Sequence, residues 1–452
     1  MDERRRARTA VGLLRVAAVV GIGAVAALVA AWRLGAVSRG TAWAEDAGLF
    51  LRERLALGPV DSLLHPYAGY LHLVPRLLVD VAWAAPVQWY AVTISLGACA
   101  VVGSVSSAVV VLARDVVPWW PARTVLALLP ALLPLGPYEI SGNAANLHWF
   151  LLFLSPWLFA HRPRTWWGAG AQAALTALVV LSEVQTVVFL PVLALAWVGR
   201  PGTGRRLRAL PVTVVALAGA AAQVVTALTT QRDSQPGSPA FTDVVAGWLL
   251  QPVAALWRPD VASVVRAVVT HGWSVVLVPA GVLLVLLVAA VVAAPWRTRW
   301  FVVALTAVSF GVWWAALLVN GVGELPWAQA RQSLAAIPPL RYAAASGLLL
   351  LAAAVVAAGA LAGRPAPAHD GGAGRRAVSV VVRTAGWGLL GAVLVATLGN
   401  AAQGPTRRSD GPVWADQVPA ARAACERDPD GTVVIRAAPW NADVPCERLV
   451  GR

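Results

Sequence analysis

The chain has 452 residues, of which 58% are hydrophobic and 13% charged, and its 36 basic and 22 acidic residues give a net charge of +14. Apolar runs long enough to cross a bilayer recur along most of the sequence, which excludes an ordinary soluble globular protein. Every basic residue is an arginine, and the arginines are spread among short connections rather than gathered on one face, which argues against nucleic-acid binding.

We therefore predict an all-α, polytopic membrane protein whose residues 1–399 form a bundle of about eleven spans. The predicted spans fall near residues 10–32, 86–112, 123–137, 147–160, 167–182, 184–198, 209–229, 273–295, 300–319, 341–362 and 378–399. Several of these segments are short or contain proline or glycine, so we expect tilted, broken or re-entrant helices among them.

Arginine placement predicts the orientation of the bundle. Four arginines precede the first span, so the N-terminus is expected in the cytoplasm. A cleaved signal peptide is the alternative for this segment, but its apolar run is long and many spans follow. The connections then assigned to the cytoplasm all carry arginine, near residues 114–123, 162–164, 200–208, 297–299 and 364–376. The alanine- and valine-rich, lysine-free composition is typical of a high-GC bacterium, so we predict a bacterial cytoplasmic membrane protein.

Most carboxylates fall on the opposite, extracytoplasmic side, where two connections are long. The first, at 33–85, holds Glu45 and Asp46, followed by the polar and aromatic residues Tyr70, His72 and Arg76. The second spans 230–272 and has apolar residues at helical spacing. Both are rich enough in apolar residues to form helices lying along the membrane surface.

Shorter outer connections add further polar groups, which are costly at membrane depth unless they face a cavity. Asn146 and His148 stand at the start of one span, and Glu183 separates two apolar runs. Arg331 and the pair Arg341-Tyr342 flank an Ile-Pro-Pro turn. We predict that these groups converge with Glu45 and Asp46 on one site.

Residues 400–452 form a polar tail, expected outside the membrane because the number of spans is odd. Thr432–Ile435 reads as a strand, and Cys425 and Cys446 are predicted to form a disulfide in this oxidising compartment. Closing a loop of about 20 residues would stabilise the tail by roughly 3 kcal/mol.

The acidic pair, the interfacial segment after it, the outer Asn-Leu-His-Trp and the late Arg-Tyr together resemble the membrane glycosyltransferases of the GT-C fold. The likeness covers the topology of residues 1–399. It implies transfer of a sugar from a polyprenyl-phosphate donor to a cell-envelope acceptor at the outer face, with membrane lipid as a further partner. Displacement of a phosphate needs a base near the acceptor hydroxyl and cations on the leaving group, roles that carboxylates and arginines fill.

The resemblance implies that Asp46 or Glu45 is the catalytic base, or that Asp46 helps to hold a divalent cation such as Mg²⁺ or Mn²⁺. It also implies that Arg341 or Arg331 meets the lipid phosphate. The family's second acidic motif has no clear counterpart. The predicted substrate-binding residues are Arg341, Tyr342, Arg331, Arg76, His72, Tyr70, Asn146, His148 and Glu183.

Other interpretations stay open from the sequence. The acidic pair could be a solvated loop pair or a helix cap, the histidines could be structural, and the outer arginines could contact lipid headgroups. No nucleotide-binding or zinc-protease motif is found, which argues against ATP-driven transport and zinc proteolysis. The alternatives to a transferase are a transporter or flippase of a lipid-linked or small polar substrate, and a non-catalytic envelope-assembly protein.

Overall fold

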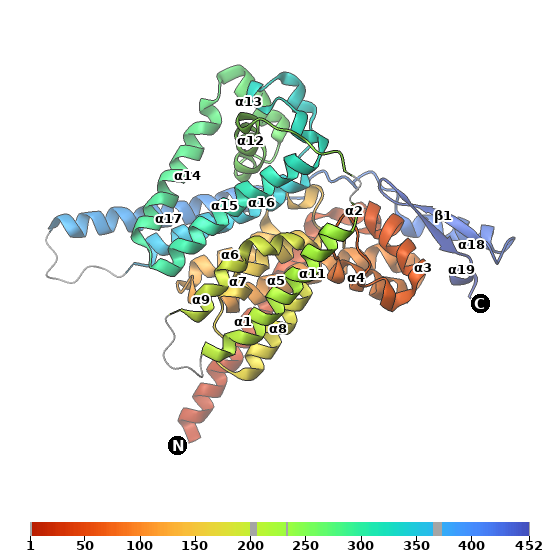
Figure 1. The fold of residues 1–452 in the computed structure, drawn as a ribbon, viewed down its shortest axis with the longest axis horizontal. Coiled ribbons are helices and arrows are strands. Elements are labelled where there is room, and N and C mark those ends of the chain that lie inside the picture. The colour runs from red at the N-terminus through yellow and green to blue at the C-terminus, as the bar shows by residue number, and fades with distance from the viewer. Residues whose placement is uncertain (1, 199–205, 232–233, 365–372, 452) are drawn as a thin grey trace.

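The computed structural model describes residues 2–198, 206–231, 234–364 and 373–451, and it is helical almost throughout (Figure 1). The α-helices up to residue 399 are α1 (Asp2–Arg33), α2 (Gly35–Gly40), α3 (Arg52–Asp61), α4 (Leu73–Ala84), α5 (Tyr90–Leu112), α6 (Trp120–Leu132), α7 (Leu147–Ala160), α8 (Trp166–Val180), α9 (Ala194–Trp197), α11 (Leu210–Thr229), α12 (Phe241–Trp248), α13 (Val261–His271), α14 (Ser274–Ala293), α15 (Trp296–Val319), α16 (Arg341–Ala362) and α17 (Ala373–Gly399). Two irregular helical segments begin at or next to predicted site residues: η1 (Asp46–Leu51) and η5 (Val184–Leu193).

Each of the eleven predicted apolar segments contains a helix, but the helices differ in length. Among the described residues, seven are long and apolar enough to cross a membrane: Gly12–Arg33, Val87–Asp115, Leu207–Thr229, Ser274–Ala293, Trp296–Val319, Arg341–Ala362 and Arg376–Gly399. The shorter helices α6, α7 and α8 have 13, 14 and 15 residues. A helix of that size is only about 20 Å long, against a bilayer core of about 30 Å. The multi-pass character is therefore supported, whereas eleven full spans are not confirmed.

Helix α16 forms the centre of one half of the bundle. It packs against α6, α14, α15 and α17, and its side chains are buried almost continuously from Ala343 to Ala362. Because these residues are small or apolar on every face, the helix is suited to burial on all sides. Its N-terminus, which carries Arg341, thereby gains a fixed position.

Small residues allow α1 and α5 to approach each other closely. Where α1 crosses α5, a Cβ atom at Gly103 would lie 2.4 Å from the carbonyl oxygen of Gly23. Neither position tolerates a side chain without separation of the two helices, the usual device by which helices in membranes pack closely. The C-terminal end of α1, beyond this contact, leads through α2 into the loop holding the acidic pair.

The connections predicted on the cytoplasmic side gather at one end of the bundle, here called the arginine-rich end. Arg297 donates to the carbonyls of Ala160 at 3.0 Å and Leu195 at 3.1 Å, and Arg364 donates to Ala293 at 2.7 Å. Parts of two of these connections, 199–205 and 365–372, lie outside the described residues. The predicted outer connections meet at the other end, called the acid-rich end because it holds Glu45, Asp46, Glu53, Glu139 and Glu183.

The tail packs against the acid-rich end, beside α3 and α4 (Figure 1). It consists of α18 (Trp414–Cys425), the antiparallel hairpin of β1 (Thr432–Arg436) and β2 (Asn441–Pro445), and α19 (Glu447–Val450). The predicted strand and the predicted Cys425–Cys446 disulfide are both present. Trp414 is fully buried, and its indole N–H donates to the carbonyl of Val87 at 2.8 Å. The tail is thus anchored to the start of α5 rather than hanging free.

The two long connections that were predicted to lie outside both contain short helices, as predicted. The first holds α2, α3 and α4, and the second holds α12 and α13. Helix α13 buries Val261, Val264, Val265 and Val268 on one face, the spacing of an amphipathic helix.

Candidate active site

The acidic pair lies where the loop after α2 turns into the π-helical segment η1. Such wide turns are frequent at functional sites, because they change the direction in which neighbouring side chains point. Tyr90 of α5 fixes this turn, since its hydroxyl donates to the backbone carbonyl of Asp46 at 2.6 Å. As a result Glu45 and Asp46, although adjacent in sequence, have different surroundings.

Asp46 is buried completely. Its carboxylate accepts the backbone N–H of Ala144 at 3.0 Å and that of Ala145 at 2.8 Å, just before α7. Burial raises the pKa of Asp46 to about 7, and the nearby Glu45 charge adds to this, while the two amides and Arg408 act in the opposite direction. The side chain therefore joins the first outer loop to the loop before α7, a positioning role.

Arg408, in the tail, completes this junction. Its guanidinium donates to the carbonyls of Ser141 at 2.7 Å and Gly142 at 2.8 Å. Gly142 has a φ of +69°, and a Cβ there would lie 2.2 Å from Leu34, so only glycine fits this turn. Burial lowers the pKa of Arg408 to about 10, and the Asp46 carboxylate partly opposes that shift.

Glu45 has the more open position. Its Oε1 atom lies 3.4 Å from Nη1 of Arg341, the first residue of α16. Its Oε2 atom accepts no hydrogen bond from the part of the chain that the structure describes. Arg341 also lies 3.8 Å from Glu139, which pairs in turn with Arg407 at 3.3 Å. The four charges form a row of alternating sign across the acid-rich end.

Two cavities meet at Glu45, Arg341 and Tyr342, which line both. The first cavity has a volume of about 230 Å³ and an aromatic wall. Its other polar and aromatic lining residues are Phe50, Tyr67, Tyr70, His72, Asn146, His148, Trp149 and Gln185. The second cavity, of about 300 Å³, is lined additionally by Trp43, Glu139, Arg407 and Trp440. Seven of the sequence-predicted residues thus line the first cavity, namely Glu45, Tyr70, His72, Asn146, His148, Arg341 and Tyr342.

Two histidines of the first cavity have defined roles. His148 hydrogen-bonds through Nδ1 to the buried carboxylate of Glu183, whose other oxygen accepts the N–H of Gln185 at 2.6 Å. This arrangement orients the ring and leaves Nε2 as its second functional atom. His72 donates from Nε2 to the carbonyl of Tyr67 at 3.2 Å, and its buried Nδ1 has no hydrogen-bond partner among the described residues.

The ionisation of His72 follows from these surroundings. Burial, together with the nearby His148 and Arg76 charges, holds the pKa of His72 well below its usual value. The ring is therefore neutral at pH 7, with a lone pair on Nδ1 available as an acceptor.

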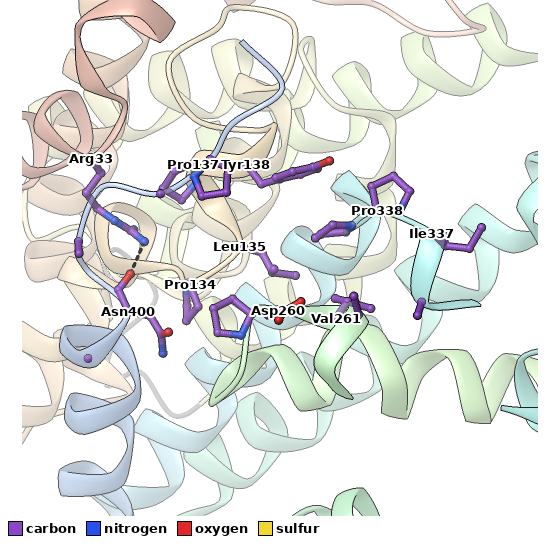
Figure 2. Close-up of a pocket in the computed structure, with 18 of the residues that line it drawn as sticks. Arg33, Pro134, Leu135, Pro137, Tyr138, Asp260, Val261, Ile337, Pro338 and Asn400 are labelled. Atoms are coloured by element: carbon purple, nitrogen blue, oxygen red, sulfur yellow. Dashed lines mark hydrogen bonds between the residues drawn. The ribbon is translucent and has the colours of Figure 1, made fainter. Parts of the chain in front are cut away.

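A third cavity, of about 470 Å³, opens nearby between Pro134–Tyr138, the start of α13 and the proline turn before α16 (Figure 2). Arg33 at its edge donates to the carbonyls of Ala131 at 2.7 Å, Leu133 at 2.9 Å and Asn400 at 2.9 Å. These bonds tie the end of α17 to the end of α1, so the arginine is a structural clamp. The rest of the lining is largely apolar and rich in proline.

Four predicted residues do not line the first two cavities: Asp46 and Glu183, whose contacts are given above, and Arg76 and Arg331. Arg76 is buried behind the first cavity, 2.6 Å from Glu53 and with its guanidinium 4.9 Å from the ring centre of Phe50, where it supports the wall. Arg331 is exposed in the connection between α15 and α16.

Three tail residues were not predicted, although Arg407 and Arg408 had a signal. They follow the last span on the side where the positive-inside rule expects few arginines. Such an exception indicates partners for the charge. Trp440 had no comparable signal, since one tryptophan in a polar tail is unremarkable.

The resemblance implies a divalent cation, with Asp46 as one of the groups that help to hold it. The described residues contain no group of three or more His, Cys, Asp or Glu side chains placed to hold a metal ion. Each oxygen of the Asp46 carboxylate accepts one backbone hydrogen bond. The divalent cation implied by the resemblance stays a prediction.

Comparison with known proteins gives no match: no protein-family model, curated protein or solved structure is significantly similar to this chain.

Proposed function

We propose that the chain is an integral membrane glycosyltransferase that moves a sugar from a polyprenyl-phosphate donor to a cell-envelope acceptor. One observation carries the proposal: the Glu45–Arg341 pair, at 3.4 Å, lies where two cavities meet at the acid-rich end of the bundle. Transfer between two substrates needs two adjoining binding spaces with a base and a cation at their junction.

In the proposed reaction, the carboxylate of Glu45, which lines both cavities, accepts the proton of the acceptor hydroxyl. The acceptor oxygen then bonds to the anomeric carbon of the donor sugar, while the bond from that carbon to the phosphate oxygen breaks. The electron pair leaves with the polyprenyl phosphate. Arg341 contacts that phosphate and stabilises its charge, a role for which the guanidinium fork is suited.

His148 supports the leaving group from the opposite wall of the first cavity. The hydrogen bond between its Nδ1 atom and Glu183 fixes the orientation of the ring, which leaves Nε2 as the atom that contacts the substrate. Asp46 acts through the backbone by holding the loop before α7 against the loop that carries Glu45.

The proposed location is a bacterial cytoplasmic membrane, with the site and the tail outside and the N-terminus inside. Clustering of the arginine connections at the opposite end supports this orientation. A disulfide in the tail fits the same compartment. Single cysteines at the exposed positions Asp61 and Trp167, in a Cys99→Ser background, test it. We expect an impermeant thiol reagent to label position 61 only from outside and position 167 only from inside; the reverse pattern would invert the topology.

Activity is tested in membranes supplied with radiolabelled polyprenyl-phosphate sugars and envelope acceptors. We expect Glu45→Gln to lower kcat by about 100-fold or more, the range of lost general-base catalysis. Glu426→Gln, an exposed carboxylate in the tail, is the matched control and should leave kcat unchanged. Full activity of Glu45→Gln would contradict the mechanism. Movement of the lipid-linked sugar across the membrane without covalent transfer would instead support a transporter or flippase.

A further inference from the structure

The second cavity has a wall that belongs to the tail. We propose that this cavity binds a carbohydrate segment of the acceptor, with Trp440 as the surface on which a sugar ring stacks. The inference rests on the proposed function, since it names the substrate that occupies one side of Glu45. Three sets of observations support it.

The first is the rigid placement of Trp440 beside the acidic pair. Ala44 donates its backbone N–H to the carbonyl of Ala438 at 3.0 Å, and Ala438 donates to that of Ala42 at 3.0 Å. A Cβ at Gly48 would lie 3.1 Å from the Trp440 ring, so the ring rests on the backbone of η1. The tail therefore holds Trp440 against the same turn that positions Glu45, as one part of the site.

The second is the chemistry of the wall. Trp440 is 42% exposed, which is enough to offer a ring face to a ligand. Sugars present apolar C–H faces alongside hydroxyls, so they suit an aromatic surface flanked by charged hydrogen-bonding groups. Arg407 and Glu139 supply such groups, and a volume of about 300 Å³ is within the range of ligand pockets.

Unmet hydrogen-bonding atoms on the same wall point to a polar ligand. The indole N–H of Trp43 is buried and has no hydrogen-bond partner among the described residues, and the same holds for Glu45 Oε2. Leaving such a group unpaired costs about 1–3 kcal/mol, and native structures rarely do so without a reason. Both residues line the second cavity, so a bound sugar would lie beside them.

The third is the position of each cavity relative to the spans. The first cavity includes Ala315, Ala316 and Val319 of α15, a candidate span, so it reaches toward the bilayer. The second cavity includes span residues only at the first turn of α16, and otherwise is lined by loops and the tail. A lipid-anchored donor therefore fits the first cavity, and a glycan that arrives from water fits the second.

Two measurements on the full-length protein in detergent test the inference. One is retention on a printed array of bacterial cell-envelope oligosaccharides, with no donor present. The other is steady-state transfer with donor and acceptor varied separately. The variants are Trp440→Ala, the conservative Trp440→Phe, and Trp167→Ala as control, a 91% exposed tryptophan near the arginine-rich end.

We expect Trp440→Ala to lose glycan retention at least about 10-fold, the loss of roughly 1.4 kcal/mol of stacking. The acceptor KM should rise similarly with the donor KM unchanged, and Trp440→Phe should recover most of both. The inference is overturned if wild type and Trp440→Ala retain glycans equally, or if wild type retains none. It is also overturned if Trp440→Ala raises only the donor KM. The wild-type protein separates the two proposals: glycan retention without any transfer would reject only the proposed reaction.

Discussion

The pH dependence of stability at Asp46 tests the central electrostatic argument. Two effects compete at this carboxylate: burial, which favours the neutral acid, and two backbone N–H donors, which favour the ion. Burial is the larger, and it raises the pKa from 3.8 in the unfolded chain to about 7 in the folded protein. The perturbation is Asp46→Asn, which keeps the shape of the side chain and removes its ionisation.

The direction in which stability changes with pH follows from proton binding to Asp46. Between pH 4 and pH 7 the folded state holds the proton more tightly than the unfolded state, so this group's contribution to wild-type stability is full below pH 4 and is lost as pH rises through 7. A shift of about three pKa units corresponds to about 4 kcal/mol. Asp46→Asn has no such dependence, so we expect it to gain stability relative to wild type as pH rises from 5 to 8.

Tryptophan fluorescence gives the apparent Tm of each protein in detergent, and the quantity compared is the Tm difference between variant and wild type at pH 5 and at pH 8. Asp61→Asn, at an exposed position, is the control for removing a carboxylate and should show an equal difference at both pH values. The reasoning is refuted if the Tm difference between Asp46→Asn and wild type is the same at both pH values, or if the variant loses stability relative to wild type as pH rises. Either result would mean that burial does not outweigh the two amides.

Three further predictions concern the supports of the site. Glu183→Gln should lower kcat by about 10-fold or more, because the His148 ring loses the carboxylate that orients it; an unchanged kcat would remove His148 from the mechanism. Gly48→Ala should raise the acceptor KM and the protease sensitivity of the tail, since its Cβ would lie 2.9 Å from Asn441 O, whereas Gly170→Ala, with no atom within 4 Å, should do neither. Loss of the disulfide in Cys425→Ser should destabilise the tail by about 3 kcal/mol, seen as faster proteolysis of the tail with the spans intact; equal rates would show that its packing suffices.

The sequence predicted the helices well because each apolar run has only one way to satisfy its backbone in a bilayer. It did not fix which runs are full spans, because a run such as Leu147–Ala160 is equally apolar whether it crosses the membrane or is buried among other helices. The tail hairpin and disulfide were predictable from local signals, a strand-like run and two cysteines in a polar segment.

The site was predictable in part for similar reasons. Polar groups such as Glu45, His148 and Arg341 stand out in apolar sequence, and seven of the predicted residues line one cavity. Trp440 could not be predicted, because its contribution comes from docking of the tail, a long-range contact with no local pattern. The distinction between Glu45 and Asp46 was equally out of reach, since it depends on the direction of two neighbouring side chains.

That distinction decides how the acidic pair should be interpreted. A pair of carboxylates in one loop invites a single role, such as a shared base or a shared cation. The π-helical turn instead places Asp46 against the amides of Ala144 and Ala145 and leaves Glu45 between two cavities. Asp46→Asn and Glu45→Gln therefore probe different properties: the first changes how stability depends on pH and how the loops are held, and the second removes the proposed base. Similar effects of both on stability, with neither affecting transfer, would leave the pair a structural feature of the loop.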